Sequence, residues 1–473
     1  MTRRNLLWLI VIATVSLLCY RKADSEHRTR YGRMFGTFTE VLEQIERKYV
    51  EEVDERELFE GALDGLISKL DPYSAYYAPL AAAESRASLN QEFGGIGIEV
   101  TIDRETKILT ILSPLPGTPA DAAGIRPGDK ILKINDESTE GFTMEDTVKR
   151  LRGKAGEPVR LEILHEGEEK PVELKIVRAV ISVDSVLGDR RRPDGTWDFT
   201  LEGHPGIGYV RVTTFGIKTA DELYDALTEL KAQGMKGLVL DLRGNTGGLL
   251  EEGAVRVSNL FIKEGRIVST RGRDRKELVV KEATGKAPFT DFPMVVLVNR
   301  FSASASEVVA ACLQDHGRAK IVGERTFGKG SVQTVIEIEG GKSELRLTTA
   351  SYWRPSGRNI HRAKNATEKD EWGVTPDKGF AVKPTDEQLL AMLRRRRARD
   401  AINVKSASAA EGKPVPKASD DKKPASDKEA DNKDTDKKDD TPAAEEKPFD
   451  SSDITIDPQL SKAVEYLEGR IGK

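Results

Sequence analysis

One short stretch of the sequence combines residues that could carry out nucleophilic chemistry. The segment NRFSASASEVVAACLQDHG, residues 299–317, places three serines, alternating with alanine, at the start of a predicted helix. A serine at such a position can act as a nucleophile, but it needs a base to remove its proton. The structural alternative is that the serines only cap the helix, a role for which one serine is enough.

Histidine is the usual base for serine, but the five histidines of the chain offer no convincing partner. His316 follows Ser304 by twelve residues on the same predicted helix, and a rise of about 1.5 Å per residue puts it out of reach. The chain contains neither a Gly-x-Ser-x-Gly nor a His-Glu-x-x-His motif, which disfavours an α/β-hydrolase and a zinc protease. A triad assembled from distant residues stays open.

Lys329 is the alternative base. It lies in TFGKGSVQ, residues 326–333, between two glycines that allow a sharp turn and a close approach of another segment. A lysine amine becomes a useful base when burial or a neighbouring cation lowers its pKa. Gln333 could hydrogen-bond the amine without adding a charge, whereas an acidic partner would raise the pKa.

These residues resemble a known family. The stretch from Asn299 to Gln333 is similar to the longest motif of the carboxyl-terminal processing peptidases, or tail-specific proteases, which use a Ser/Lys dyad. The family spaces its two residues as Ser304 and Lys329 are spaced here, 25 positions apart. The resemblance implies Ser304 as nucleophile, Lys329 as general base and Gln333 as the residue that orients the lysine. Ser302 and Ser306 would then have supporting roles, and Glu307 suits the first turn of the helix.

Negative charge that develops on a scissile carbonyl needs hydrogen-bond donors. The Ala305 N–H, at a predicted helix N-terminus, is one candidate. The segment DLRGNTGG, residues 241–248, resembles the family's DLR-x-N-x-GG turn, with threonine where proline is frequent, and implies Gly247 or Gly248 as the second donor. Phosphate binding by this turn is disfavoured, because it matches neither Gly-x-Gly-x-x-Gly nor a Walker A motif.

A second resemblance concerns substrate binding. EFGGIGIEV, residues 92–100, and PLPGTPADAAGIRPGDKILKIND, residues 114–136, resemble a PDZ domain that covers most of residues 93–180. Glycine N–H groups can converge on the carboxylate of a peptide C-terminus, while the following strand pairs with the peptide. A glycine-rich spacer domain is the alternative. The candidate peptide-binding residues are Gly94, Gly95, Ile96, Gly97 and Ile98, with Val148 as a further pocket wall.

Hydrophobic periodicity indicates the elements that must position these residues. Spacing in residues 31–91 is helical, and residues 181–382 alternate strands with helices, which predicts a multidomain α/β protein with a layered core. The resemblance implies a core of the ClpP/crotonase type. We expect these regions: a signal-anchor or signal peptide (1–22), a helical region (23–92), a PDZ domain (93–180), an α/β protease core (181–404), a disordered linker (405–450) and a docking helix (451–473).

The net charge and the composition limit the functions that the chain can have. The net charge of −4 argues against general nucleic-acid binding, and two cysteines give no disulfide framework. LRRRRARD, residues 393–400, is expected to be an exposed helix end or a membrane-surface contact, and Asp241 is expected to form a structural pair with Arg243. In the last predicted helix one apolar face should dock onto a domain, formed by Leu460, Ala463, Val464 and Leu467.

The N-terminus indicates export. Two arginines precede roughly fifteen mostly apolar residues, 6–20, a length closer to a signal-peptide core than to a full membrane span. Since no small-x-small cleavage site follows, an uncleaved signal-anchor is favoured over a cleaved signal peptide and over a buried helix. Either export interpretation places the rest of the chain in the cell envelope, on the periplasmic or extracytoplasmic face of the inner membrane.

We therefore expect a serine-type endopeptidase that recognises substrate C-termini through its PDZ domain and cleaves extracytoplasmic proteins near their C-terminal tails, with no cofactor and no metal. Its partners would be proteins or peptides with exposed C-termini and the membrane, but not nucleic acid. The resemblance adds a possible homodimer through the helical region. The alternatives are a catalytically silent PDZ scaffold, a crotonase-like acyl enzyme and a PDZ protease with a His/Asp/Ser triad.

Overall fold

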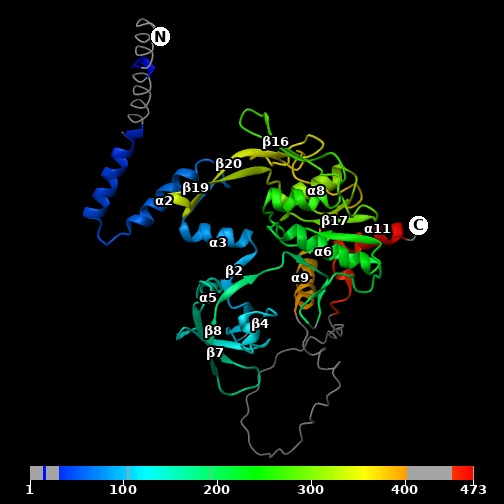
Figure 1. Ribbon diagram of the computed structural model, residues 1–473, viewed down its shortest axis with the longest axis horizontal. Coiled ribbons are helices and arrows are strands. Elements are labelled where there is room, and N and C mark those ends of the chain that lie inside the picture. The colour runs from blue at the N-terminus through cyan, green and yellow to red at the C-terminus, as the bar shows by residue number, and fades with distance from the viewer. Residues whose placement is uncertain are drawn as a thin grey trace, which may run out of the picture. The chain divides into compact units, whose positions relative to one another are not determined.

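The computed structural model describes residues 14–16, 31–32, 34–103, 106–192, 194–401 and 450–471 (Figure 1). The expected signal-anchor, apart from residues 14–16, and the expected disordered linker, apart from residue 450, lie outside the described residues. None of the described helices is long and apolar enough to span a bilayer. The chain divides into two compact units after Ala78.

The first unit is mainly helical. Its elements are a helix over residues 34–48, α2 (Glu55–Ile67) and β1 (Ala75–Tyr77). Asp54 caps α2, because its carboxylate accepts the N–H of Arg56 at 2.7 Å, one of the donors that a helix start leaves unpaired. In the segment before it, Phe35 and Val41 of the first helix and Tyr49 just after that helix leave more than half of their surface exposed.

The second unit begins with α3 (Pro79–Leu89), followed by a small antiparallel β-domain (Figure 1). A sheet of order β3-β4-β5-β7-β8, with β6 paired to β5, surrounds a core of isoleucine, leucine and valine, while β2 pairs with β9. The strands are β2 (Glu92–Gly95), β3 (Ile98–Ile102), β4 (Leu109–Pro114), β5 (Lys130–Ile134), β6 (Glu137–Ser138), β7 (Pro158–Leu164), β8 (Val172–Val177) and β9 (Ala179–Ser182), and the helices are α4 (Pro119–Ala122) and α5 (Met144–Leu151).

The rest of the second unit is an α/β core whose described residues form two large sheets and a two-stranded one of β11 and β12. In the first, of order β10-β13-β14-β17-β18, the last four strands are parallel and β10 is antiparallel. The second is antiparallel and joins β16, β15, β20 and β19 in that order. The strands are β10 (Val186–Leu187), β11 (Arg190–Arg191), β12 (Trp197–Asp198), β13 (Ile207–Val212), β14 (Gly237–Asp241), β15 (Arg266–Arg271), β16 (Glu277–Glu282), β17 (Met294–Val298), β18 (Lys320–Gly323), β19 (Ser331–Ile338) and β20 (Ser343–Trp353).

Helices cover both faces of the parallel sheet. The helices of the core are α6 (Thr219–Ala232), the π-helix η1 (Leu250–Val255), α7 (Arg256–Asn259), α8 (Ala305–Asp315), α9 (Asp386–Asp400) and α11 (Pro458–Ile471), with short 3₁₀ turns η2 (Glu339–Gly341) and η3 (Ile454–Ile456). Leu238 and Leu240 of β14 pack into the core formed with α6 and α8, whereas Val239 between them packs with α11. Since alternate residues of a strand face opposite sides, the sheet lies between two helical layers, and the predicted multidomain α/β class is confirmed.

The last helix docks on the parallel sheet. Leu460, Ala463, Val464 and Leu467, the four residues expected on one face, are all buried there. Two residues at the start of this region bond the guanidinium of Arg243: Asp457 Oδ1 at 2.9 Å and Gln459 Oε1 at 3.1 Å. The expected structural pair is present as well, since Arg243 Nη2 lies 2.6 Å from Asp241 Oδ2.

The expectation that LRRRRARD is an exposed helix end is wrong for two of its arginines. Arg395 and Arg399 are each only 4% exposed, while Arg394 and Arg397 face solvent. Residues four positions apart share one face of a helix, and this face of α9 meets the fully buried carboxylate of Asp189, which bonds Arg399. Arg395 and Arg399 therefore lie in the protein interior, beside a buried carboxylate.

Candidate active site

Ser304 lies at the turn between β17 and α8 in a strained conformation. Its φ of 55° and ψ of −116° fall where a residue with a Cβ is disfavoured, and only 8% of its surface is exposed. Such strain persists only where the surroundings impose it, and it concentrates at active sites. The turn therefore has a property expected of a nucleophile's position and not of an ordinary helix cap.

The two flanking serines hold this turn in place. Ser302 Oγ donates to the carbonyl of Leu242 at 2.8 Å, and Ser306 Oγ donates to the carbonyl of Asn245, also at 2.8 Å. Both acceptors follow β14, so the serines tie the turn before α8 to the glycine turn after β14. The hydroxyls of Ser302 and Ser306 are thus engaged in holding the turn, whereas Ser304 stays the predicted nucleophile.

A buried carboxylate joins the serine turn to the lysine loop. Glu307 Oε2 accepts the N–H of Ser304 at 2.9 Å and the N–H of Lys329 at 2.8 Å. Its Oε1 accepts the N–H of Gly328 at 2.7 Å and the hydroxyl of Thr326 at 2.5 Å. The backbone nitrogens of Ser304 and Lys329 therefore share one acceptor atom, and the two predicted catalytic residues are brought together.

The pKa values of Glu307 and Lys329 are shifted for different reasons. Burial raises the pKa of Glu307 to about 7, although its four hydrogen-bond donors oppose this rise. The pKa of Lys329 lies below its usual value, first because the side chain is largely buried and then because the positive charge of Arg346 disfavours a second cation. The charge of Glu307 acts on Lys329 in the opposite direction. A lowered pKa is what a lysine base requires.

Gln333, the predicted orienting residue, lies in β19 directly opposite Thr348 of β20. Its amide nitrogen donates to Ser331 Oγ at 2.8 Å and to Thr348 Oγ1 at 3.2 Å. Because an amide nitrogen carries two N–H groups, these two bonds use both, and the carbonyl oxygen is the group that can accept from an amine.

The two candidate oxyanion glycines have different surroundings. The Gly247 N–H donates to Asn245 Oδ1 at 2.8 Å, so this donor is already used, and Gly248 is the better candidate of the pair. Gly247 has a close-approach role instead: with φ at 108°, a Cβ on it would lie 2.8 Å from Ser304 Cβ and 3.0 Å from the Ala305 nitrogen. The glycine turn thus adjoins the Ala305 N–H, the other predicted donor.

The predicted peptide-binding residues are spread over two strands of the β-domain. Gly94 and Gly95 belong to β2 and pair with β9, so they do not form one continuous anion nest with Gly97, which alone has a positive φ of 80°. Ile96 is 2% exposed and lies in the domain core. Ile98, at the start of β3, is half-buried and lines a cavity of about 780 Å³. Val148 on α5 is exposed.

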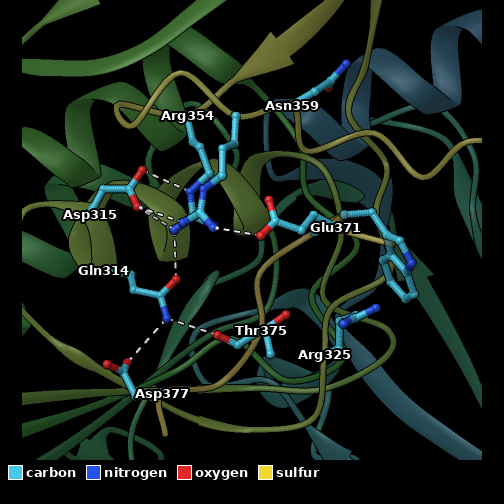
Figure 2. Close-up of a pocket in the computed structure, with 11 residues that line it drawn as sticks. Gln314, Asp315, Arg325, Arg354, Asn359, Glu371, Thr375 and Asp377 are labelled. Carbon is cyan, nitrogen blue, oxygen red and sulfur yellow. Dashed lines mark hydrogen bonds and ion pairs between the residues drawn. The ribbon is translucent and has the colours of Figure 1, made fainter. Parts of the chain in front are cut away.

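The loop after β20 supports the site through a polar cluster around a cavity of about 550 Å³ (Figure 2). Arg354 bonds Asp315 at 2.6 Å and Gln314 at 2.7 Å, and Gln314 donates to the carbonyl of Thr375 at 2.9 Å. The N–H of the residue before Thr375 donates to Thr326 Oγ1 at 2.8 Å. The cluster therefore fixes the hydroxyl that bonds Glu307.

From the sequence, Glu307 is predicted only to suit the first helical turn, and no role is predicted for Thr326 or Arg346. One signal was available, because a serine followed three positions later by glutamate has the spacing of a capping box. Within the part of the chain that the structure describes, there is no group of three or more His, Cys, Asp or Glu side chains arranged to hold a metal ion.

Three family models match parts of the chain. Residues 206–379 match the model of peptidase family S41, residues 110–165 match a PDZ domain, and residues 17–79 match the N-terminal domain of the activating protease CtpB.

Individual relatives extend the match over most of the chain. The carboxy-terminal-processing protease of Bartonella bacilliformis is 40% identical over 349 residues, which cover 73% of this chain and 74% of that one. The carboxy-terminal processing protease CtpA of Bacillus subtilis is 37% identical, with 69% and 67% covered. Among solved structures, a photosystem II D1 C-terminal processing protease is 32% identical, covers 75% of this chain and 90% of its own, and has a TM-score of 0.40.

Proposed function

Because this chain belongs to peptidase family S41 and is a carboxy-terminal processing serine protease, we propose that Ser304 and Lys329 are its catalytic dyad. One observation carries the proposal: the N–H groups of both residues donate to the same oxygen of the buried Glu307 carboxylate. The strained backbone of Ser304 and the lowered pKa of the largely buried Lys329 also support the proposal.

The chemistry follows from these positions. The neutral amine of Lys329 takes the proton of the Ser304 hydroxyl as Oγ attacks the scissile carbonyl, and the new ammonium then gives that proton to the leaving amine. The resulting ester on Ser304 is cleaved by a water molecule that Lys329 deprotonates in the same way. The N–H groups of Ala305 and Gly248 stabilise the oxyanion of both tetrahedral intermediates. Gln333 orients the amine by accepting a hydrogen bond through its carbonyl oxygen.

The test of the dyad is proteolysis of an unfolded protein by the wild type, Ser304→Ala and Lys329→Ala. Loss of any triad member in serine proteases leaves only a small residual rate, so we expect both variants to lose about 10³-fold or more in kcat. Exposed Lys236→Ala is the matched control and should retain activity. Full activity in Lys329→Ala alone would mean that another base operates, and full activity in both variants would disprove the dyad.

The proposal includes selection of substrates by their C-termini through the PDZ domain. The half-buried Ile98 beside a cavity supports a peptide-binding role for β3, and an extended peptide can add to such a strand by backbone hydrogen bonds. Two versions of one substrate, with a free or an amidated C-terminal carboxylate, should differ in KM. Equal KM values would show that the carboxylate is not recognised.

We also propose a core of the ClpP/crotonase type.

We further propose a location in the cell envelope, with residues 1–22 as the membrane anchor. The support for the anchor is the apolar run after two arginines at the N-terminus. Fractionation of cells that produce the full chain or a chain starting after residue 22 would test this, because only the full chain should stay in the membrane after carbonate extraction. Whether the helical first unit forms a homodimer can be measured on the same two chains by light scattering.

A further inference from the structure

One charged residue of the β19–β20 ribbon, which follows the Lys329 loop, has no place in the proposed reaction. Arg346 lies in β20, opposite Val335 of β19 and two residues before Thr348. Because directly paired residues and residues two apart in a strand share a face, Arg346 lies on the face of the β19–β20 ribbon that carries Gln333. The hydrogen bonds of Gln333 to Ser331 and Thr348 identify that face independently.

Two contacts fix the guanidinium of Arg346. Its Nη2 bonds Ser85 Oγ of α3 at 2.5 Å and Glu344 Oε2 at 3.1 Å. The other oxygen of Glu344, a residue only 2% exposed, accepts from Arg86 Nη1 at 2.7 Å. Two arginines therefore share one carboxylate, so the cluster keeps a net charge of +1. Since α3 supplies both Ser85 and Arg86, the charge is held by the sheet and a helix together.

We propose that Arg346 is a positioning residue for the reaction: it is a fixed cation that keeps the Lys329 amine neutral, and Glu344 sets the strength of its field. This inference rests on the proposed dyad. Two like charges in a partly buried site repel each other, so the arginine, which stays charged, favours the uncharged lysine. The charge of Arg346 is one of the causes that lower the pKa of Lys329.

Two other charged residues near the lysine loop do not take this role. The carboxylate of Glu307 on α8 accepts the Lys329 N–H and favours the ammonium. Arg362, in the loop after β20, donates its N–H to the Gly328 carbonyl, but its guanidinium lies 4.5 Å from the centre of the Trp372 ring. Of these three neighbours, Arg346 is the cation that acts on the amine.

The first experiment measures kcat/KM against pH for a quenched fluorescent peptide. Arg346→Met should move the acidic limb upward by on the order of one pH unit, so activity falls about tenfold below the limb and changes little above it. Arg346→Lys should restore the limb, because it keeps the charge. Glu344→Gln should move it in the opposite direction, since the cluster charge rises. Arg273→Met, an exposed arginine between β15 and β16, is the control and should leave the profile unchanged.

A second experiment follows the amine without using activity. In Ser304→Ala protein, cyanate carbamylates Lys329 at a rate that is read by peptide mass spectrometry. Divided by the concentration of isocyanic acid, the reacting species, this rate follows the fraction of neutral amine. Its midpoint should lie at a higher pH when Arg346→Met is added. An unchanged midpoint, or an activity loss in Arg346→Met that is the same at every pH, would overturn the role of Arg346. Retained activity in Lys329→Ala would instead overturn the dyad, so the two failures are distinguishable.

Discussion

Replacing Glu307 with glutamine should change how the stability of the protein depends on pH. The carboxyl group is completely buried, and this burial raises its pKa to about 7 from an ordinary value of 4.5. Because the pKa is higher in the folded state, the folded protein holds the proton more tightly than the unfolded chain does. The stabilisation from this proton is complete below about pH 4.5 and is lost as the pH rises through about 7.

The size of the effect follows from the same two values. A difference of about 2.5 pH units corresponds to about 3 kcal/mol in the free energy of unfolding. Glutamine has nearly the same shape but does not ionise, so the advantage of wild type over Glu307→Gln should shrink by about 3 kcal/mol between pH 4.5 and 8. At the acidic end the variant should be less stable by about 1–3 kcal/mol, because its NH₂ group cannot accept the Gly328 N–H.

Urea unfolding in the Ser304→Ala background, where self-cleavage is prevented, measures this difference at each pH. Exposed Glu173→Gln is the matched control and should run parallel to wild type. With Ser304 retained, Glu307→Gln should also lose on the order of 100-fold in kcat, since small displacements of catalytic groups cost that much. A stability gap that stays constant from pH 4.5 to 8 would refute the reasoning, and so would full activity in the variant.

Three further changes test other parts of the site and its frame. Gly247→Ala should abolish proteolysis with an unchanged circular dichroism spectrum, because its Cβ would lie 2.8 Å from Ser304 Cβ; kcat/KM at the wild-type level would contradict this. Leu467→Ala, in the buried face of α11, should lower the urea unfolding free energy by about 2–5 kcal/mol. Arg243→Met should lower it by about 3–5 kcal/mol, because Asp457 loses its buried partner, and a change below about 1 kcal/mol would argue against that clamp.

Local sequence patterns were sufficient to predict those elements whose own apolar residues indicate that they are buried. The apolar run of β17, MVVLV, is buried at every position, and the apolar face of α11 was evident from its spacing. Glu307 shows the limit of such reading. Its sequence context indicates an exposed residue of a first helical turn, but the segment from Thr326 to Lys329, about twenty positions away, folds over the helix start and buries it.

The prediction that the arginines of α9 are exposed was wrong for a related reason. Four consecutive arginines have the composition of a solvated surface, and nothing within the helix reveals a buried Asp189 some two hundred positions earlier that compensates Arg399. For the glycines of the β-domain the carboxylate nest stays a prediction, because flexibility permits a nest without requiring one. Gly94 and Gly95 lie in the strand that pairs with β9, a long-range partner that the local sequence does not reveal.

The same long-range order explains why three distant motifs meet at one site. The glycine turn follows β14, the Ser304 turn follows β17 and the Lys329 loop follows β18. These strands are parallel neighbours in the order β14-β17-β18, so their carboxyl ends reach the same edge of the sheet. Sequence order alone does not supply this adjacency, because β15 and β16 intervene and join the other sheet. Had β15 entered the parallel sheet between β14 and β17, the glycine turn and Ser304 would lie one strand spacing further apart, about 4.8 Å, and the hydrogen bond from the Ser306 hydroxyl to Asn245 could not form.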